Sequence, residues 1–375
     1  MSTSNVRSIK KDGALPPFED ALTLPGKLYW DQAVFNAEKE AIFSSMWLCI
    51  GRCEDIEDPG SYFTWQQDNE RILIVRGKDK KIRAFFNVCR HRGSRLVEEE
   101  SGCGLNRITC PYHAWTYASD GRLVSAPTMG DDFDKNDFPL VEAPCDTYGG
   151  FIFINLDENA EPLESFLSDL PDLSRYQLPE LRRAARVEYV VDANWKLICE
   201  NYNECYHCAL VHPQLHRISD ANSGGKMERG RCFSGGSMHL NDGFSTMTMS
   251  GHSDHPVIPG LSEEDHRTVQ YYTIYPNLLI SPHPDYLLTH TIWPIGPGKT
   301  RIVCEWFFTQ EAVNQPGFDP SDAVEFWDVT NKQDWGLCVR AQRGAESRGY
   351  RPGKYHPHES AVWAFDDWYR DFMEL

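Results

Sequence analysis

The sequence lacks any apolar stretch long enough to cross a membrane, and it is poor in basic residues. No run of about 18 apolar residues and no secretory leader occurs in the chain of 375 residues, so we expect a cytoplasmic protein with no membrane partner. Lys and Arg number 37 against 55 Asp and Glu, which gives a net charge of −18. Because phosphate binding needs clustered basic residues, no nucleic-acid partner is expected.

The sequence also lacks a dinucleotide-binding fingerprint and an export signal. No G-x-G-x-x-G segment follows a strand-like run, so NAD(P)H or flavin would be held by a separate protein. Without export, the 12 cysteines are expected to be thiols or metal ligands rather than disulfides. Six have no ligand-like spacing and are expected to be small buried hydrophobes or inert thiols: Cys49, Cys53, Cys103, Cys145, Cys232 and Cys304.

The chain is longer than one hydrophobic core usually supports, so two domains are expected. Residues 1–24 are polar and predict a weakly ordered arm, and a helix is expected from about residue 31 to 46. Aromatic and β-branched runs within residues 62–88, a hairpin signal at Asp120-Gly121 and a further run at 149–156 then predict a compact β domain.

The second half mixes strand-like and helical runs. A proline-punctuated segment at 161–178 predicts a linker and a helix, and further helices are expected at 195–212 and 320–343. Residues 219–260 lack periodicity and predict a loop or lid. Four strands are expected, at 185–196, 270–282, 286–294 and 300–310.

Two mixed ligand pairs stand in the predicted β domain. Cys89-x-His91 and Cys110-x-x-His113 each supply one thiolate and one imidazole, whereas zinc sites usually group like ligands together. Two loops of this kind suit a Rieske two-iron, two-sulfur cluster, whose imidazoles give it a high reduction potential. The competing interpretation is structural zinc.

A second group of candidate ligands follows in the predicted helix at 195–212. Glu204 and His207 are three residues apart and share a helix face, while His212 needs a bend to converge with them before Pro213 ends the helix. Read locally, these residues form a two-histidine, one-carboxylate triad for ferrous iron. The alternative is that they are ordinary surface carboxylates and hydrogen-bonded core histidines.

From about Leu24 onward, these motifs resemble the Rieske non-haem iron oxygenases. The resemblance assigns Cys89 and Cys110 to one iron of the cluster, and His91 and His113 to the other. The family often has glycine where this chain has Ala114, a change expected to leave the cluster intact.

In that family the carboxylate at the position of Glu204 is not a ligand. It bridges to a cluster histidine of the neighbouring subunit, so electrons would pass from His91 or His113 through Glu204 and His207. The third ligand comes later, and the segment QDWGLCVRAQRGAESRGY implies Asp334, with Asp328 as the nearby competitor.

The resemblance implies an α+β fold with three parts. These are an N-terminal arm and helix at 1–43, an all-β Rieske domain at 44–160, and a catalytic mononuclear iron domain at 161–375 with an antiparallel sheet flanked by helices. It also implies a homotrimer that uses O2, served by a separate NAD(P)H-dependent reductase carrying flavin or an iron-sulfur cluster.

Glutamate at position 204 and the segment ESRGYRPG are similar to the carnitine, choline and glycine-betaine branch, whereas most ring-hydroxylating members carry aspartate at the bridge. This resemblance implies hydroxylation of an N-methyl group on a small quaternary or tertiary amine, with release of formaldehyde. Aromatic side chains could cage the ammonium group, although aromatic residues on strands more often belong to the core: Tyr202, Tyr206, Tyr271, Tyr275, Tyr286 and Trp293.

Two other functions compete with amine oxidation. One is ring hydroxylation or O-demethylation of an aromatic acid, and the other is electron transfer through the Rieske cluster alone. The second would leave His207, His212 and Asp334 without a role.

Overall fold

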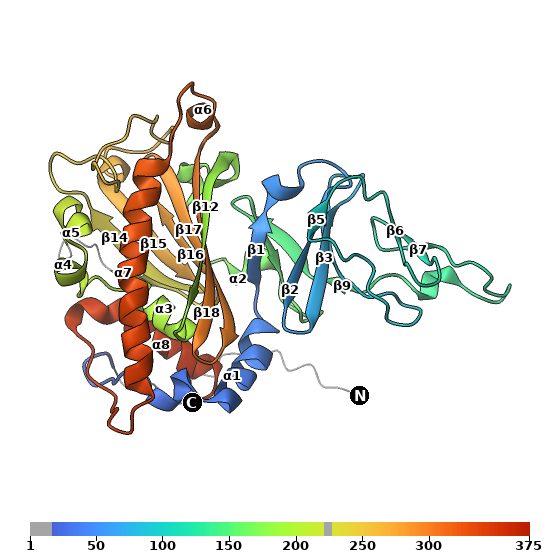
Figure 1. The fold of residues 1–375 in the computed structure, drawn as a ribbon, viewed down its shortest axis with the longest axis horizontal. Coiled ribbons are helices and arrows are strands. Elements are labelled where there is room, and N and C mark those ends of the chain that lie inside the picture. Colours follow the sequence, from blue (N-terminus) through green and yellow to red (C-terminus); the bar gives the residue numbers. More distant parts are fainter. Residues whose placement is uncertain (1–16, 221–226) are drawn as a thin grey trace. The chain divides into compact units, whose positions relative to one another are not determined.

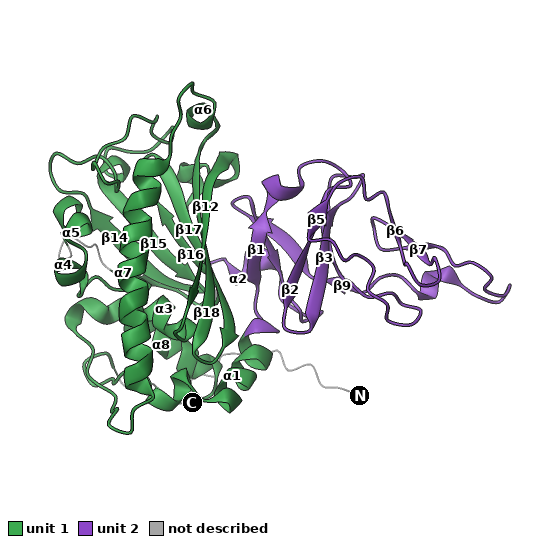
Figure 2. Cartoon of the chain, viewed as in Figure 1, with its two compact units in different colours: residues 1–42, 169–375 green, residues 43–168 purple. Residues whose placement is uncertain are grey.

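The computed structural model describes residues 17–220 and 227–375, which divide into two compact units (Figure 2). Residues 43–168 form the β unit. The described residues up to Ile42 and those from Asp169 onward form the α+β unit, so the segment before the β unit belongs to the fold of the C-terminal half. The predicted α+β fold class is confirmed.

The β unit is built from three antiparallel sheets (Figure 1). The first has the order β1-β11-β10, the second β5-β2-β3-β4-β9 and the third β6-β7-β8. The strand bounds are β1 Leu48–Arg52, β2 Tyr62–Gln67, β3 Glu70–Arg76, β4 Ile82–Phe86, β5 Ser101–Gly102, β6 Arg107–Thr109, β7 Thr116–Ala118, β8 Leu123–Ser125, β9 Glu142–Ala143, β10 Cys145–Tyr148 and β11 Phe151–Ile154. The short helices are η3 Cys53–Ile56, η4 Lys135–Asp137 and α2 Leu163–Phe166.

The core of the β unit reaches the two ligand loops. Cys89 and Cys110 are buried in the same hydrophobic cluster as Phe85, Trp115 and Tyr117. These sulfur atoms are therefore held in apolar surroundings at the ends of strands, where side chains are fixed by packing.

The α+β unit contains a seven-stranded antiparallel sheet in the order β12-β18-β17-β16-β15-β14-β13. Its strands are β12 Leu181–Val191, β13 Glu228–Arg229, β14 Phe233–His239, β15 Thr268–Ile274, β16 Leu278–Pro282, β17 Tyr286–Gly296 and β18 Lys299–Thr309. Its helices are η1 Gly26–Tyr29, α1 Gln32–Glu38, η2 Lys39–Phe43, η5 Ser174–Tyr176, η6 Leu178–Glu180, α3 Trp195–Tyr202, α4 Cys208–Val211, α5 Pro213–Ile218, η7 Asp265–Arg267, α6 Gln310–Val313, α7 Ser321–Ala345, η8 Pro357–Glu359 and α8 Ser360–Phe372. Helices α3, α7 and α8 pack together, and α7 runs across the sheet in Figure 1.

A buried ion pair ties the N-terminal segment to this unit. Lys196 Nζ on α3 lies 2.5 Å from Glu38 Oε1 on α1, and both side chains are fully buried. The Tyr369 hydroxyl also donates to Glu38, which brings α8 into the same network. The predicted arm falls partly outside the described residues, but Ala21 and Leu24 are buried, so the prediction of weak order is wrong for them.

The segment predicted as a loop or lid contains the strands β13 and β14, and the prediction is wrong there. β14 pairs with β15 along its whole length, although its sequence FSGGSMH gives no strand signal. A Cβ at Gly235 would stand 2.1 Å from the carbonyl oxygen of Tyr271, so glycine permits the close approach of the two backbones. Pairing with a neighbour therefore overrides local propensity.

The single helix predicted at 195–212 is also wrong, because the structure breaks it into α3 and α4. His212 adopts a non-helical conformation with ψ 73°, and Pro213 begins α5 rather than ending a helix. Proline suits the first position of a helix because its nitrogen needs no hydrogen bond there. The interruption supplies the bend that His212 needs.

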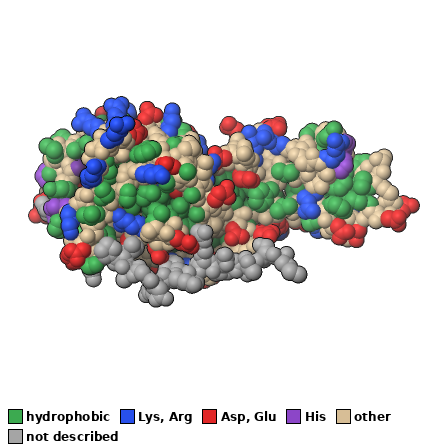
Figure 3. Space-filling model, turned by 90° about the horizontal axis from the view of Figure 1, so that it is seen from below, with side chains coloured by type: hydrophobic (Ala, Val, Ile, Leu, Met, Phe, Trp, Pro, Cys, Tyr) green, Lys and Arg blue, Asp and Glu red, His purple; other side chains and the backbone are tan. Residues whose placement is uncertain are grey.

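No helix in residues 17–220 and 227–375 is long and apolar enough to cross a membrane. On the face drawn in Figure 3, acidic and basic side chains are interspersed with apolar ones, and histidine side chains reach the surface of the β unit.

Candidate metal centres

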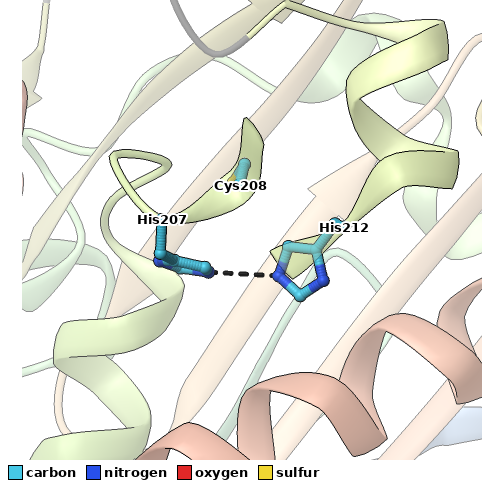
Figure 4. A group of neighbouring side chains, drawn as sticks. All are labelled: His207, Cys208 and His212. Carbon is cyan, nitrogen blue, oxygen red and sulfur yellow. Dashed lines mark hydrogen bonds between the residues drawn. The ribbon is translucent and has the colours of Figure 1, made fainter. Parts of the chain in front are cut away.

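Three side chains of the α+β unit converge on one point. His207 Nε2 lies 3.1 Å from His212 Nε2, and the Oδ1 atom of Asp334 lies 3.1 Å from the first and 2.9 Å from the second. Figure 4 shows the two imidazole rings pointing toward each other. Two imidazole nitrogens and one carboxylate oxygen form the donor set that ferrous iron takes in non-haem oxygenases.

Each histidine ring is oriented by a partner on its other nitrogen. His207 Nδ1 contacts Glu204 Oε1, and His212 Nδ1 lies 2.7 Å from Gln333 Oε1. Gln333 is itself held by a hydrogen bond from Gln214. Metal-binding histidines are usually oriented in this way, with the second nitrogen donating to an oxygen so that the first is free to bind the metal. The arrangement therefore fits a metal site.

The charges around His207 also favour a cation at this point. Burial lowers the pKa of His207, but hydrogen bonds to Asp334 and Glu204 outweigh it and raise the pKa to about 10. Burial raises the pKa of Asp334, yet the two imidazoles bring it below its usual value. Two carboxylates facing two imidazoles therefore stabilise positive charge, which either protons or a metal ion could supply.

Asp328, the competing candidate for the third ligand, has different hydrogen-bond partners. It accepts hydrogen bonds from the Tyr189 hydroxyl at 2.9 Å and from Lys332 Nζ at 2.6 Å. Asp334 and Asp328 are six residues apart on α7 and therefore face different directions on the helix. The structure brings Asp334, and not Asp328, next to the two histidines.

Glu204 stands in the turn between α3 and α4. Its Oε2 atom accepts hydrogen bonds from the backbone N–H of Tyr206 at 2.5 Å and of His207 at 3.3 Å, while Oε1 contacts the His207 ring. One carboxylate thus shapes the turn and orients the ring. The bridging role in electron transfer stays a prediction.

The β unit brings its four candidate ligands to neighbouring loop tips. His91 Nδ1 lies 3.2 Å from His113 Nδ1, and His91 is exposed. Cys89 and Cys110 are buried, and the Cys89 Sγ atom lies 3.4 Å from the Tyr117 hydroxyl. Burial raises the pKa of Cys110, but hydrogen bonds from the backbone N–H groups of Tyr112 and His113 outweigh it and leave the pKa lowered. Two buried sulfurs with two outward imidazoles fit the ligand set of a Rieske cluster.

Polar and aromatic contacts hold these loops. The buried Asn87 accepts hydrogen bonds from the backbone N–H groups of Leu96 and Val97. The ring of Trp115 stacks on His91 with 5.0 Å between centroids. Gly93 has φ +69°, a conformation that glycine adopts without strain.

Ala114 also adopts a left-handed conformation, with φ +57°, which favours glycine. The Cβ of a non-glycine residue costs about 1 kcal/mol there, partly offset by the greater freedom of glycine in the unfolded chain. We therefore expect Ala114→Gly to raise the free energy of unfolding by up to about 1 kcal/mol. Urea denaturation of the purified protein, followed by loss of cluster absorbance, measures this. A lower midpoint for the variant would show that Ala114 is not strained.

One cysteine prediction is wrong. Cys205 and Cys208 form a disulfide, with Cα atoms 4.9 Å apart, because the turn before α4 puts two cysteines three residues apart on one side of the chain. Cys208 lies near His207 and His212, but its sulfur is bonded to Cys205. The six cysteines predicted to be small buried hydrophobes or inert thiols are free. Cys49, Cys232 and Cys304 are buried, and Cys103 is exposed.

The aromatic residues predicted to cage a substrate do not gather in one place. Tyr202 and Tyr271 lie edge to face, with 6.3 Å between ring centroids. Tyr206 is 58% exposed and stacks on His356. Trp293 is buried on β17, at a position that alternates to the opposite face of the sheet from residue 290. Asn201, which precedes Tyr202, places its Nδ2 atom 3.5 Å from His207 Nε2, so the end of α3 that carries Tyr202 lies beside the candidate iron site.

Three residues near the candidate iron site were missed by sequence reasoning. His290, Asn331 and Trp335 lie between the sheet and α7, where His290 Nε2 contacts Asn331 Oδ1 at 3.2 Å and the His290 and Trp335 rings lie 6.3 Å apart. The spacing of Asn331 and Asp334 on one helix was visible in the sequence, but no local signal pairs α7 with β17.

A Rieske-type ligand set in one unit and a two-histidine, one-carboxylate set in the other define the class of Rieske non-haem iron oxygenases. Residues 46–144 match the Rieske [2Fe-2S] domain, and residues 178–375 match the ring hydroxylating alpha subunit (catalytic domain). The chain belongs to this family of oxygenase α subunits, which hold a Rieske 2Fe-2S cluster and a mononuclear iron. The catalytic-domain match also makes the electron-transfer-only interpretation wrong.

Similar proteins extend the comparison over nearly the whole chain. The glycine betaine monooxygenase oxygenase subunit of Pseudomonas aeruginosa is 34% identical over 95% of this chain and 90% of its own length. The carnitine monooxygenase oxygenase subunit of Acinetobacter pittii is 33% identical over 93% and 91%. The crystal structure of the quaternary ammonium Rieske monooxygenase CntA with γ-butyrobetaine has a TM-score of 0.74 at 30% identity, covering 96% of both chains. Naphthalene 1,2-dioxygenase from Rhodococcus, at 22% identity and TM-score 0.73, shares the fold.

Proposed function

We propose that this protein is the oxygenase component of a monooxygenase that hydroxylates an N-methyl group of a small, betaine-like quaternary or tertiary amine. The observation that carries the oxygenase chemistry is the convergence of His207, His212 and Asp334 within 3.1 Å of one another. The amine substrate is supported by the relatives named for glycine betaine and carnitine, which align along more than nine-tenths of the chain.

The residues divide into three proposed roles. The first role is cluster binding, in which Cys89 and Cys110 would bind one iron and His91 and His113 the other. The second is binding of the mononuclear iron by His207, His212 and Asp334. The third is the connection between the two sites, which Glu204 would provide. When bound, the mononuclear iron supplies the chemistry of dioxygen activation and the cluster supplies an electron. The domains would then span 44–160 and 161–375, with the arm at 1–43.

The overall reaction balances with an external source of electrons. The N–CH3 group, O2, two electrons and two protons give N–CH2OH and water. The hydroxymethyl product then loses its O–H proton, the C–N bond breaks with its electron pair passing to nitrogen, and formaldehyde leaves. The electrons require a partner, so we propose an NAD(P)H-dependent reductase that carries flavin or an iron-sulfur cluster.

We further propose a homotrimer in which the cluster of one copy serves the iron of the next. Support comes from exposed side chains at both ends of this route. His91 and Tyr112 are exposed at the cluster loops, and Tyr206 and Leu210 are 58% and 90% exposed beside Glu204 and His207. Exposed apolar side chains around a redox site are typical of an interface. Sedimentation of the purified protein tests the trimer.

The substrate class is tested by following formaldehyde with a generic reductase and NADH. We expect formaldehyde from at least one of glycine betaine, L-carnitine, γ-butyrobetaine or choline, at a rate coupled to O2 consumption. Benzoate and methoxybenzoate serve as controls for the aromatic-acid alternative. Hydroxylated or O-demethylated aromatic product without formaldehyde from any amine would reject the proposed substrate class while leaving the oxygenase chemistry in place.

A further inference from the structure

His290 is a buried imidazole beside the candidate iron site, and one of its two ring nitrogens has no hydrogen-bond partner among the described residues. It lies on β17 and is 2% exposed. Its Nε2 atom contacts Asn331 Oδ1 at 3.2 Å, whereas Nδ1 has no hydrogen-bond partner among the residues that the structure describes. A buried polar atom without a hydrogen-bond partner is rare in folded proteins, and it lowers stability unless a ligand supplies the missing hydrogen bond.

The surroundings of His290 connect it to the iron ligands. Asn331 precedes Asp334 by one turn of α7, so the two side chains share a helix face. The ring of Tyr202 on α3 lies 6.1 Å from the His290 ring, and that of Trp335 lies 6.3 Å from it, both edge to face. His290 therefore stands on the sheet opposite the helices that carry the iron ligands, flanked by two aromatic rings.

The contacts of Asn331 decide whether His290 Nδ1 donates or accepts a hydrogen bond. The amide nitrogen of Asn331 donates to the Cys304 sulfur at 3.6 Å, so its Oδ1 atom is the acceptor for a hydrogen bond from His290 Nε2–H. Burial lowers the pKa of His290 to about 4, so the ring is neutral near pH 7. A neutral ring that carries its proton on Nε2 has a lone pair on Nδ1 and can only accept there.

We propose that Nδ1 of His290 accepts a hydrogen bond from a hydroxyl group of the substrate, which makes His290 a specificity-determining residue for hydroxyl-bearing amines. The inference rests on the proposed function, because it places an N-methyl amine at this iron. The faces of Tyr202 and Trp335 would contact the ammonium group, which has no N–H of its own when quaternary. A substrate without a hydroxyl leaves the buried nitrogen unpaired, and such sites discriminate strongly against the analogue that lacks the donor.

Matched substrates that differ only in the hydroxyl test the proposal. L-carnitine is compared with γ-butyrobetaine, and choline with ethyltrimethylammonium, by kcat/KM for formaldehyde release. We expect the hydroxylated member of at least one pair to be preferred by about 10- to 100-fold. Equal values within each pair, or a preference for glycine betaine over every hydroxylated substrate, would overturn the proposal.

Two variants separate recognition from packing. In His290→Gln the glutamine amide lies near the position of Nε2 and can keep the hydrogen bond to Asn331. In His290→Asn the shorter asparagine amide lies near the position of Nδ1 instead. We expect H290Q to reduce the hydroxyl preference to less than about threefold and H290N to keep most of it. A structural role would instead lower kcat/KM for both members of a pair equally, and that result would contradict the inference.

The two proposals fail differently. Formaldehyde from amines with no dependence on the hydroxyl overturns the role of His290 and leaves the proposed function standing. No formaldehyde from any amine overturns both. The wild-type comparison needs no substitution, so the test holds even if H290Q does not fold.

Discussion

Replacing Asp334 by alanine is expected to lower the iron content from about three to about two per chain and to reduce turnover at least about 100-fold. The reason is geometric, because Asp334 Oδ1 lies within 3.1 Å of both histidine Nε2 atoms and supplies the only carboxylate of the proposed set. Two neutral imidazoles alone bind ferrous iron weakly. The absorbance of the cluster should be unchanged, since its ligands lie in the β unit.

Asp328→Ala is the matched control for this prediction. It removes a carboxylate from the same helix, but one that bonds Tyr189 and Lys332 rather than the histidines. Iron content and turnover should stay near those of the wild type. Loss of the third iron in Asp328→Ala with retention in Asp334→Ala would reassign the ligand, and metal analysis on both proteins decides between them.

Glu204→Gln is expected to keep all the iron and yet lower turnover by about 100-fold. The glutamine oxygen can still accept from His207 Nδ1–H, so the ring keeps the orientation that Glu204 enforces. What is lost is the negative charge on the proposed route between cluster and iron, together with the hydrogen bonds that Glu204 Oε2 accepts from the backbone N–H groups of Tyr206 and His207. Glu204→Ala differs, because it also removes the partner of the His207 ring and should weaken iron binding by about 10- to 100-fold.

The decisive measurement for Glu204→Gln is the rate at which the reduced cluster is reoxidised by O2 with substrate present. A bridging role predicts slow reoxidation with a full complement of iron. Glu264→Gln offers a control, since Glu264 also pairs with a histidine, His239, but at an exposed site elsewhere. Wild-type reoxidation in Glu204→Gln would show that this carboxylate only shapes the turn.

The two metal sites differed in how far local sequence could define them. Each proposed cluster loop carries its own cysteine and histidine within four residues, and the strands that flank the loops have clear β patterns, so short-range geometry predicts the pairs. The iron site draws His207 and His212 from one turn but Asp334 from a helix more than 120 residues later. Spacing alone gave Glu204 as the carboxylate of the triad, and only the family resemblance replaced it by Asp334.

The chain's own residue order was sufficient to predict the candidate ligand pairs of the cluster, the two candidate histidines of the iron site and a chain that mixes strands with helices. Each of these depends on neighbours within a few residues or on a repeating apolar pattern. Contacts between distant segments were needed for the rest. β14 exists because β15 lies beside it, Pro213 begins a helix because the chain breaks at His212, and His290 meets Asn331 because α7 crosses β17. Such contacts depend on how the elements pack, and a local pattern carries no information about which faces will meet.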